Sequence, residues 1–175
     1  MGAFAIFDAA TLSLLPVYGM RSGLDIATAS LSLTALIVGN VVLQFPIGWL
    51  ADRFAKRRVL AGCALVTAVT LALLPTVMAT ALMWPVLVLA GAAGYGVYTV
   101  ALAELGDRFS GQELVTGSSA FAVMWGSGAL LGSVSGGWSM SGFGPHGLPL
   151  YLAVVYAGFF VAVILRGRSA AASAP

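Results

Sequence analysis

The chain has 175 residues, of which 60% are hydrophobic and 8% are charged, and its mean hydropathy is +1.01. Soluble globular domains carry about 25% charged residues, so this composition excludes that class and indicates an integral membrane protein. The formal net charge of +2 does not indicate a nucleic-acid-binding protein, because the basic residues flank apolar segments and form no binding stripe.

Residues 1–168 contain long apolar segments separated by short connections, and they predict a bundle of membrane-spanning helices. A chain of this length can hold about six helices of roughly 20 residues. The segments are continuous, whereas the strands of a membrane barrel would be short and alternating. Residues 169–175 are expected to form a disordered tail. The predicted spans are residues 3–20, 27–50, 59–76, 82–103, 115–138 and 148–165.

The basic residues are divided unequally between the two sides of the predicted bundle. Only Arg21 falls on one side, and all the others fall on the opposite side. Because Lys and Arg collect on the cytoplasmic side of membrane proteins, both termini are expected to face the cytoplasm. The bases on that side are Arg53, Lys56, Arg57, Arg58, Arg108, Arg166 and Arg168.

The connection between the second and third spans, residues 48–58, reads Gly-Trp-Leu-Ala-Asp-Arg-Phe-Ala-Lys-Arg-Arg. Its one acid and four bases cannot lie in hydrocarbon, so it must be a tight loop outside the bilayer. The pattern Gly-x-x-x-Asp-Arg-x-small-Lys-Arg closely resembles the cytoplasmic loop motif of the major facilitator superfamily of transporters. The alternative interpretation is a basic topology anchor in another kind of six-span protein.

The resemblance covers essentially the whole chain and is best to the second half of bacterial members, with residues 14–19 and 44–53 adding to it. It implies an all-α membrane protein with six transmembrane helices, half of a major-facilitator-type fold, built from two inverted three-helix repeats. Complete members have twelve helices in two halves with the substrate cavity between them. The expected location is the bacterial inner membrane.

In the superfamily, the matching Gly, Asp and first Arg of the loop help to lock the cytoplasmic side when the protein opens outward. Carried over, these are Gly48, Asp52 and Arg53, with Arg57 at the final basic position. This chain departs from the family pattern at two positions, with Ala55 in place of Gly and Lys56 in place of Arg.

Chemistry alone suggests related roles for these loop residues. Gly48 would let the second helix approach a neighbour closely, and Asp52 would cap a helix or form a salt bridge. Arg57 and Arg58 are suited to acidic partners or lipid head groups. A second cytoplasmic cluster, with Glu113 at its edge, is expected to bridge to the loop bases and complete a gate. The predicted gate residues are Gly48, Asp52, Arg53, Arg57, Arg58, Glu104, Asp107 and Arg108.

Asp8 is the only formally charged side chain well inside any predicted span. An ionisable group in hydrocarbon is costly and is by default a candidate functional residue. With Thr11 and Tyr18 it forms a polar stripe on the first helix that is suited to lining a cavity and accepting a proton. The alternative is that Asp8 lies near the cytoplasmic end of the helix and reaches the interface.

Two further polar pairs are candidates for binding a substrate. Asn40 and Gln44 are one turn apart on the second helix, and Tyr95 and Tyr98 form a similar pair on the fourth. Such amides and phenols can hydrogen-bond a solute in an apolar cavity. They can equally tie helices together, each contributing about 0.6 kcal/mol, and packing is the favoured role for any single one.

Gly128, Gly132 and Gly136 repeat at every fourth position within residues 128–137. Small residues at this spacing let two membrane helices pack backbone to backbone, which is their favoured role. The stretch is similar to the family's glycine-rich fifth-helix motif, although Ser133 stands where the family has Pro.

The sequence does not predict an enzyme, a cofactor or a metal site. A rhomboid-like protease would need Gly-x-Ser-Gly and an intramembrane histidine, but Ser127 lies in Trp-Gly-Ser-Gly and His146 lies in an outer loop. One His and one Cys, Cys63, do not provide a metal-ligand set.

The leading functional hypothesis is a half-size secondary active transporter of a small solute that works by alternating access. Six helices alone would leave the stripe of Asp8, Asn40 and Gln44 facing lipid, so the expected partner is a parallel second copy or a separate six-helix half, besides membrane lipid. The alternatives are a non-transporting membrane scaffold, an excised domain of a full-length transporter and, less favoured, a lipid-binding or channel-like module.

Overall fold

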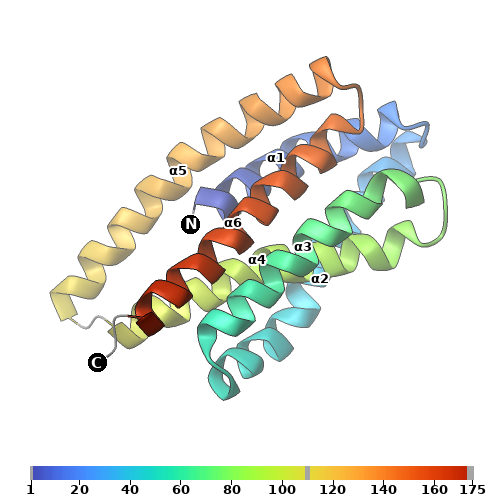
Figure 1. The fold of residues 1–175 in the computed structure, drawn as a ribbon. Helices are drawn as coiled ribbons and strands as arrows, with labels where there is room; N and C mark the ends of the chain where they lie inside the picture. The colour runs from blue at the N-terminus through green and yellow to red at the C-terminus, as the bar shows by residue number, and fades with distance from the viewer. Residues whose placement is uncertain (1, 109–110, 173–175) are drawn as a thin grey trace.

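The computed structural model describes residues 2–108 and 111–172, although the side chains of residues 108, 111, 114, 115 and 167–172 are not described. The described chain is entirely helical apart from short connections (Figure 1). Its helices are α1 (Gly2–Arg21), α2 (Ile26–Arg53), α3 (Lys56–Val77), α4 (Met83–Arg108), α5 (Gly111–Gly142) and α6 (Gly147–Ala172).

The helices are longer than the predicted spans, because they continue beyond the apolar stretches into polar sequence. In particular, α6 extends through Ala172, so the first residues of the segment expected to be a disordered tail are helical. Within the described residues, α1 to α4 and α6 are long and apolar enough to cross a membrane. The helix α5 is not among them, since nearly half of its residues are glycine or serine.

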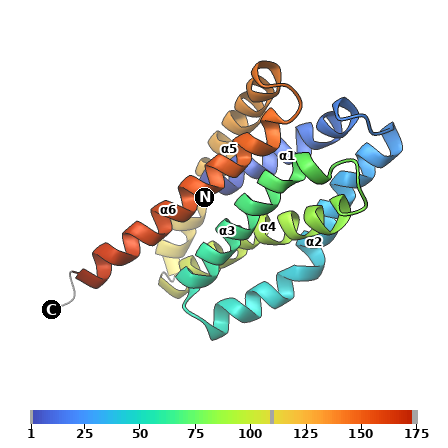
Figure 2. The ribbon, with the colours of Figure 1, turned by 45° about the vertical axis from the view of Figure 1, so that its right-hand side comes forward.

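The helices pack in specific pairs that determine which side chains meet. Helix α2 packs along α4, helix α1 packs along α5, and α3 lies against both α4 and α6 (Figures 1 and 2). The core between the helices consists of apolar and aromatic side chains. Most of them come from α1, α2, α3, α4 and α6, and α5 contributes Met140 near its end. The largest fully buried side chains are Tyr18, Tyr156, Phe7, Leu36, Leu74, Leu87, Leu148 and Leu152.

Glycines allow α2 and α4 to cross with their backbones in contact. A methyl group at Gly39 would overlap the carbonyl oxygen of Val88, and one at Gly91 would overlap the carbonyl oxygen of Leu36. Because the two glycines face each other's helix, each provides the space that the opposite backbone occupies. No side chain larger than hydrogen fits at either position without separating the helices.

The three glycines of α5 face α1 in the same manner. A methyl group would lie 2.6 Å from Ala5 Cβ at Gly128 and 2.5 Å from the carbonyl oxygen of Ile6 at Gly132. At Gly136 it would lie 2.9 Å from Leu14 Cδ1, which is the far end of a flexible side chain. The spacing that the sequence analysis identified therefore lies along the α1–α5 contact, and it is tightest at its middle glycine.

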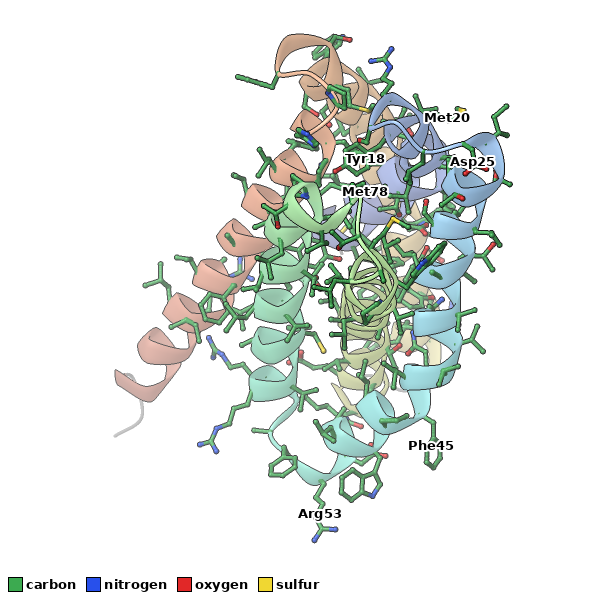
Figure 3. All side chains as sticks on the ribbon, turned by 90° about the vertical axis from the view of Figure 1, so that its right-hand side faces the viewer. Tyr18, Met20, Asp25, Phe45, Arg53 and Met78 are labelled. Atoms are coloured by element: carbon green, nitrogen blue, oxygen red, sulfur yellow. The ribbon has the colours of Figure 1, made fainter. Side chains whose placement is uncertain are left out.

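The two ends of the bundle differ in charge. At one end, Asp25 caps α2, with its Oδ2 accepting the N–H groups of Ala27 (3.0 Å) and Thr28 (3.1 Å). Hydrogen bonds from the hydroxyl and the N–H of Thr28 hold the pKa of Asp25 below its ordinary value. Arg53 lies at the opposite end (Figure 3), beyond a change in direction of α2 next to Phe45. Pro46 accounts for this bend, because proline removes a helical hydrogen bond and crowds the preceding turn.

The glycine crossing makes a testable prediction about stability. Gly39→Ala should lower the free energy of unfolding by about 1–3 kcal/mol, because the added methyl group must push α2 away from α4. The matched control is Gly62→Ala on α3, where a methyl group would meet nothing within 4 Å. Thermal unfolding of both variants in the same detergent provides the comparison. Equal melting temperatures would contradict the close crossing.

Candidate functional site

Asp8 lies inside the bundle, at the point where α1, α4 and α5 meet. Its side chain is 7% exposed. Tyr95 Oη donates a hydrogen bond to Asp8 Oδ1 (2.7 Å), and Trp125 Nε1 donates to Asp8 Oδ2 (3.2 Å). Both donors are neutral, and the ion pairs of the described residues do not include Asp8. The carboxylate thus joins three helices.

An aromatic cluster surrounds the Asp8–Tyr95 hydrogen bond. Phe4 stacks on Tyr98 with ring centroids 4.9 Å apart and meets Tyr95 edge-on at 5.6 Å. Phe7 meets Tyr95 and Tyr156 edge-on at 5.8 and 5.4 Å. Edge-on and stacked rings attract one another through their quadrupoles, so Tyr95 is held on two sides. This cluster orients the Tyr95 hydroxyl towards the carboxylate.

The predicted amide pair of α2 connects to the same site through Thr99. The Thr99 hydroxyl donates to Gln44 Oε1, and Gln44 Nε2 donates to Asn40 Oδ1. Thr99 lies one turn after Tyr95 on α4 and also approaches the Tyr95 carbonyl oxygen at 3.4 Å. The structure therefore places the Asn40–Gln44–Thr99 hydrogen bonds next to the Asp8–Tyr95 pair, and the link between the two groups is the backbone of Tyr95 and not its hydroxyl. The expectation that this stripe would face lipid is wrong for Asp8, which is buried, and Asn40 and Gln44 are half-buried.

Two residues of the site were not identified from the sequence. Thr99 could have been found, because it follows Tyr95 by four positions and must lie on the same face of the helix. Trp125 could not have been found, because nothing in the sequence pairs an indole of the fifth helix with a carboxylate of the first. Its ring edge is polar while its faces are apolar, so it can close a polar site within an apolar bundle.

The other two residues of the predicted stripe on α1 lie in different places. Thr11 is next to the site, because its hydroxyl donates to the carbonyl oxygen of Phe7 (2.7 Å) and lies within hydrogen-bonding range of the Tyr95 side chain. Tyr18 lies near the end of the bundle that carries Asp25 (Figure 3). Its hydroxyl is 3.3 Å from His146 Nδ1, and the two rings meet edge-on. His146, which the sequence places in a loop, thus contacts α1.

A pocket of about 500 Å³ opens next to the buried carboxylate, between α1, α4 and α5. Asp8 follows Phe4 by one helical turn and binds Trp125, and both aromatic residues line the pocket. The carboxylate therefore lies directly behind its inner wall. The lining residues are Phe4, Tyr98, Leu102, Ser118, Phe121, Ala122 and Trp125.

At the charged end of the bundle, Lys56 and Arg57 at the start of α3 bond to α4 and α6. Lys56 forms an ion pair with Asp107, and its Nζ also donates to the carbonyl oxygen of Ala103 (3.3 Å). Arg57 donates from Nε to the carbonyl oxygen of Val163 on α6 (3.0 Å). A bridge between the two charged clusters is therefore present, and Lys56 makes it with Asp107.

The other predicted gate residues of this loop project away from the bundle. A methyl group at Gly48 would meet nothing within 4 Å, so the expectation that Gly48 allows a close helix approach is wrong within the described chain. Asp52 is exposed. The Arg53 guanidinium lies over the Trp49 ring, 5.3 Å from its centroid. Arg58 is exposed beside an apolar groove of about 480 Å³ between α2, α3 and α4.

The remaining predicted residues of the second charged cluster lie near the end of α4 and the start of α5. Glu104 is half-buried, and Glu113, at the start of α5, is exposed. The side chain of Arg108, the last predicted gate residue, lies outside the described residues.

Long apolar helices around an internal polar network define a polytopic α-helical membrane protein. The sequence model of the Major Facilitator Superfamily matches residues 1–175, so the chain belongs to that family. Members of this family are transporters and not enzymes. No solved structure gives a significant match.

The relatives described below are bacterial proteins. The chain is 25% identical over 150 residues to "Uncharacterized MFS-type transporter YfkF" of Bacillus subtilis (strain 168), covering 86% of this chain and 38% of that protein. It is 30% identical over 143 residues to "Uncharacterized MFS-type transporter YcaD" of Shigella flexneri, covering 81% of this chain and 36% of the relative. The chain thus spans less than two fifths of the length of these relatives.

The polar site makes a prediction that separates two similar tyrosines. Tyr95→Phe should lower the free energy of unfolding by about 1–2 kcal/mol, because a buried carboxylate oxygen loses its donor. Tyr98→Phe is the matched control, since the Tyr98 hydroxyl has no hydrogen-bond partner among the described residues. Denaturant unfolding in detergent measures both. An equal loss for the two variants would mean that the Asp8–Tyr95 hydrogen bond does not stabilise the fold.

Proposed function

We propose that the chain is one half of a secondary active transporter and moves a small solute by alternating access, with a parallel second copy or a separate six-helix half as its partner. The observation that carries this proposal is the polar network around Asp8, which adjoins a pocket on the side of the bundle formed by α1, α4 and α5. A buried, fully hydrogen-bonded polar network next to a pocket is a costly arrangement in hydrocarbon, and it is the kind of site that binds a solute.

The composition of α5 supports a partner on this side. Lipid favours continuously apolar helices, but α5 carries glycine or serine at nearly half of its positions. It packs mainly on α1, so much of its other surface is uncovered within the six-helix bundle. Ser118 and Ser127 are exposed there. A partner half or a water-filled cavity suits this surface better than acyl chains do.

The packing pattern supports two inverted three-helix repeats within the bundle. Exchanging α1–α3 with α4–α6 converts the α1–α5 pair into the α4–α2 pair, and these two pairs are the ones whose backbones touch at glycines. A repeat relation of this kind is common in transporter folds. We infer a second, parallel relation between two such bundles, with an axis along the membrane normal.

The charge distribution supports an orientation with both termini in the cytoplasm of a bacterial cell, in the inner membrane. Arg53 lies at one end of the bundle and Asp25 lies at the other (Figure 3), and Lys56 and Arg57 follow Arg53 closely in the chain. In this orientation the Lys56–Asp107 ion pair is on the cytoplasmic side. Rocking of the two halves would open and close that side around the pocket.

Flux measurements test the proposal. We expect solute uptake into liposomes that contain the chain crosslinked as a parallel dimer, or mixed with its complementary half, and a large loss of uptake with Asp8→Asn. Asp25→Asn is the control, because it removes a carboxylate at the far end of the bundle and keeps a good helix cap.

The absence of flux with every solute tested, in both the dimer and the mixed assembly, would contradict transport by this chain. It would favour a non-transporting scaffold or an excised domain. Native mass spectrometry of the chain in nanodiscs distinguishes the two proposed assemblies, since a dimer and a monomer differ twofold in mass.

A further inference from the structure

The pocket between α1, α4 and α5 combines aromatic faces with a nearby carboxylate, and no basic residue is among the described residues that line it. We propose that this pocket binds an organic cation, a solute in which a quaternary or protonated ammonium, or a comparable onium centre, carries apolar substituents. The inference rests on the proposed function and assigns a substrate class to its site.

The first argument is the unbalanced charge of Asp8. Its two oxygens accept hydrogen bonds from Tyr95 and Trp125, which are neutral, while Lys56 pairs with Asp107 at the end of the bundle. Hydrogen bonds stabilise a buried carboxylate but do not cancel its charge. The negative potential therefore extends into the adjoining pocket, whose walls are mostly apolar. A cation in the pocket would lower this electrostatic cost and an anion would raise it.

The second argument is the chemistry of the walls. Phe4, Tyr98, Phe121 and Trp125 supply aromatic rings, and an aromatic face attracts a cation through its negative quadrupole. Among the described lining residues, Tyr98 and Ser118 bear hydroxyl groups. A sugar or another many-hydroxyl solute would lose more hydrogen bonds to water than these walls return. At about 500 Å³ the pocket accommodates a molecule of drug-like size.

Trp125 connects the two features. It is 45% exposed, so its ring forms part of the pocket surface while its indole N–H holds Asp8 Oδ2. A bound cation can therefore interact with the indole face from the pocket and with the carboxylate immediately behind it. Trp125 acts as a positioning residue, because it fixes the carboxylate at the inner wall.

A pair of ions with the same shape and opposite charge tests this assignment. Tetraphenylphosphonium and tetraphenylborate are added to the full chain in nanodiscs, with empty nanodiscs to correct for partition into lipid, and binding is followed by tryptophan fluorescence. We expect saturable binding of the phosphonium and no saturable binding of the borate. Asp8→Asn should weaken phosphonium binding by about tenfold or more, whereas Asp25→Asn should leave it unchanged.

The tryptophan variants locate the site. Trp125→Phe should remove most of the fluorescence response and weaken binding several-fold, while Trp138→Phe, at an exposed position outside the pocket, should do neither. Equal binding of the two ions, or phosphonium binding that is insensitive to Asp8→Asn in a variant that still folds, would overturn the inference.

The binding and flux experiments test the cation assignment and the proposed transport function separately. Flux of a neutral or anionic solute without phosphonium binding would leave the proposed function in place and overturn only the cation assignment. Saturable, Asp8-dependent phosphonium binding without any flux would support the cation site and count against transport by this chain.

Discussion

The structure depends on the burial of one carboxylate in a bundle made for hydrocarbon. Asp8 is acceptable there only because Tyr95 and Trp125 satisfy both of its oxygens. These donors come from α4 and α5, so the requirement of one side chain on α1 specifies where two other helices must lie. The aromatic contacts of Tyr95 and the link from Thr99 to Gln44 then extend the ordered site to α2. Without the Asp8 carboxylate, α4 and α5 would no longer need to present Tyr95 and Trp125 to α1.

Close helix contacts make this meeting point possible. Side chains as short as those of Asp8 and Thr99 can reach partners on neighbouring helices only where the backbones approach within a small distance. Gly39 and Gly91 provide that approach between α2 and α4, and Gly132 provides it between α1 and α5. Glycine in a helix is otherwise unfavourable, so its use at these crossings exchanges local helix stability for interhelical packing.

The ion pair at the end of the bundle and the hydrogen bonds around Asp8 lie in different parts of the molecule. Lys56 binds Asp107 and Arg57 binds the carbonyl oxygen of Val163 at one end, and the polar network that contains the Asp8 carboxylate lies within the bundle. This separation leaves no basic group among the described residues that line the pocket near Asp8, which underlies its proposed preference for cations. The same end carries Arg53 and Arg58 on the surface, where acidic groups of a partner half or of lipids can reach them.

The sequence by itself determined the class of protein and the family, because long apolar runs can only be membrane helices and the loop of residues 48–58 carries a specific pattern. It also identified Asp8, Tyr95 and the glycines of α5, since charge in hydrocarbon and small-residue spacing are local signals. Only the tertiary structure revealed Trp125 and Thr99 as partners, buried Asp8 where the stripe was expected to face lipid, and left space around Gly48. These features depend on which helices cross and on the position along each helix at which they cross. Packing between segments that are distant in the chain sets both.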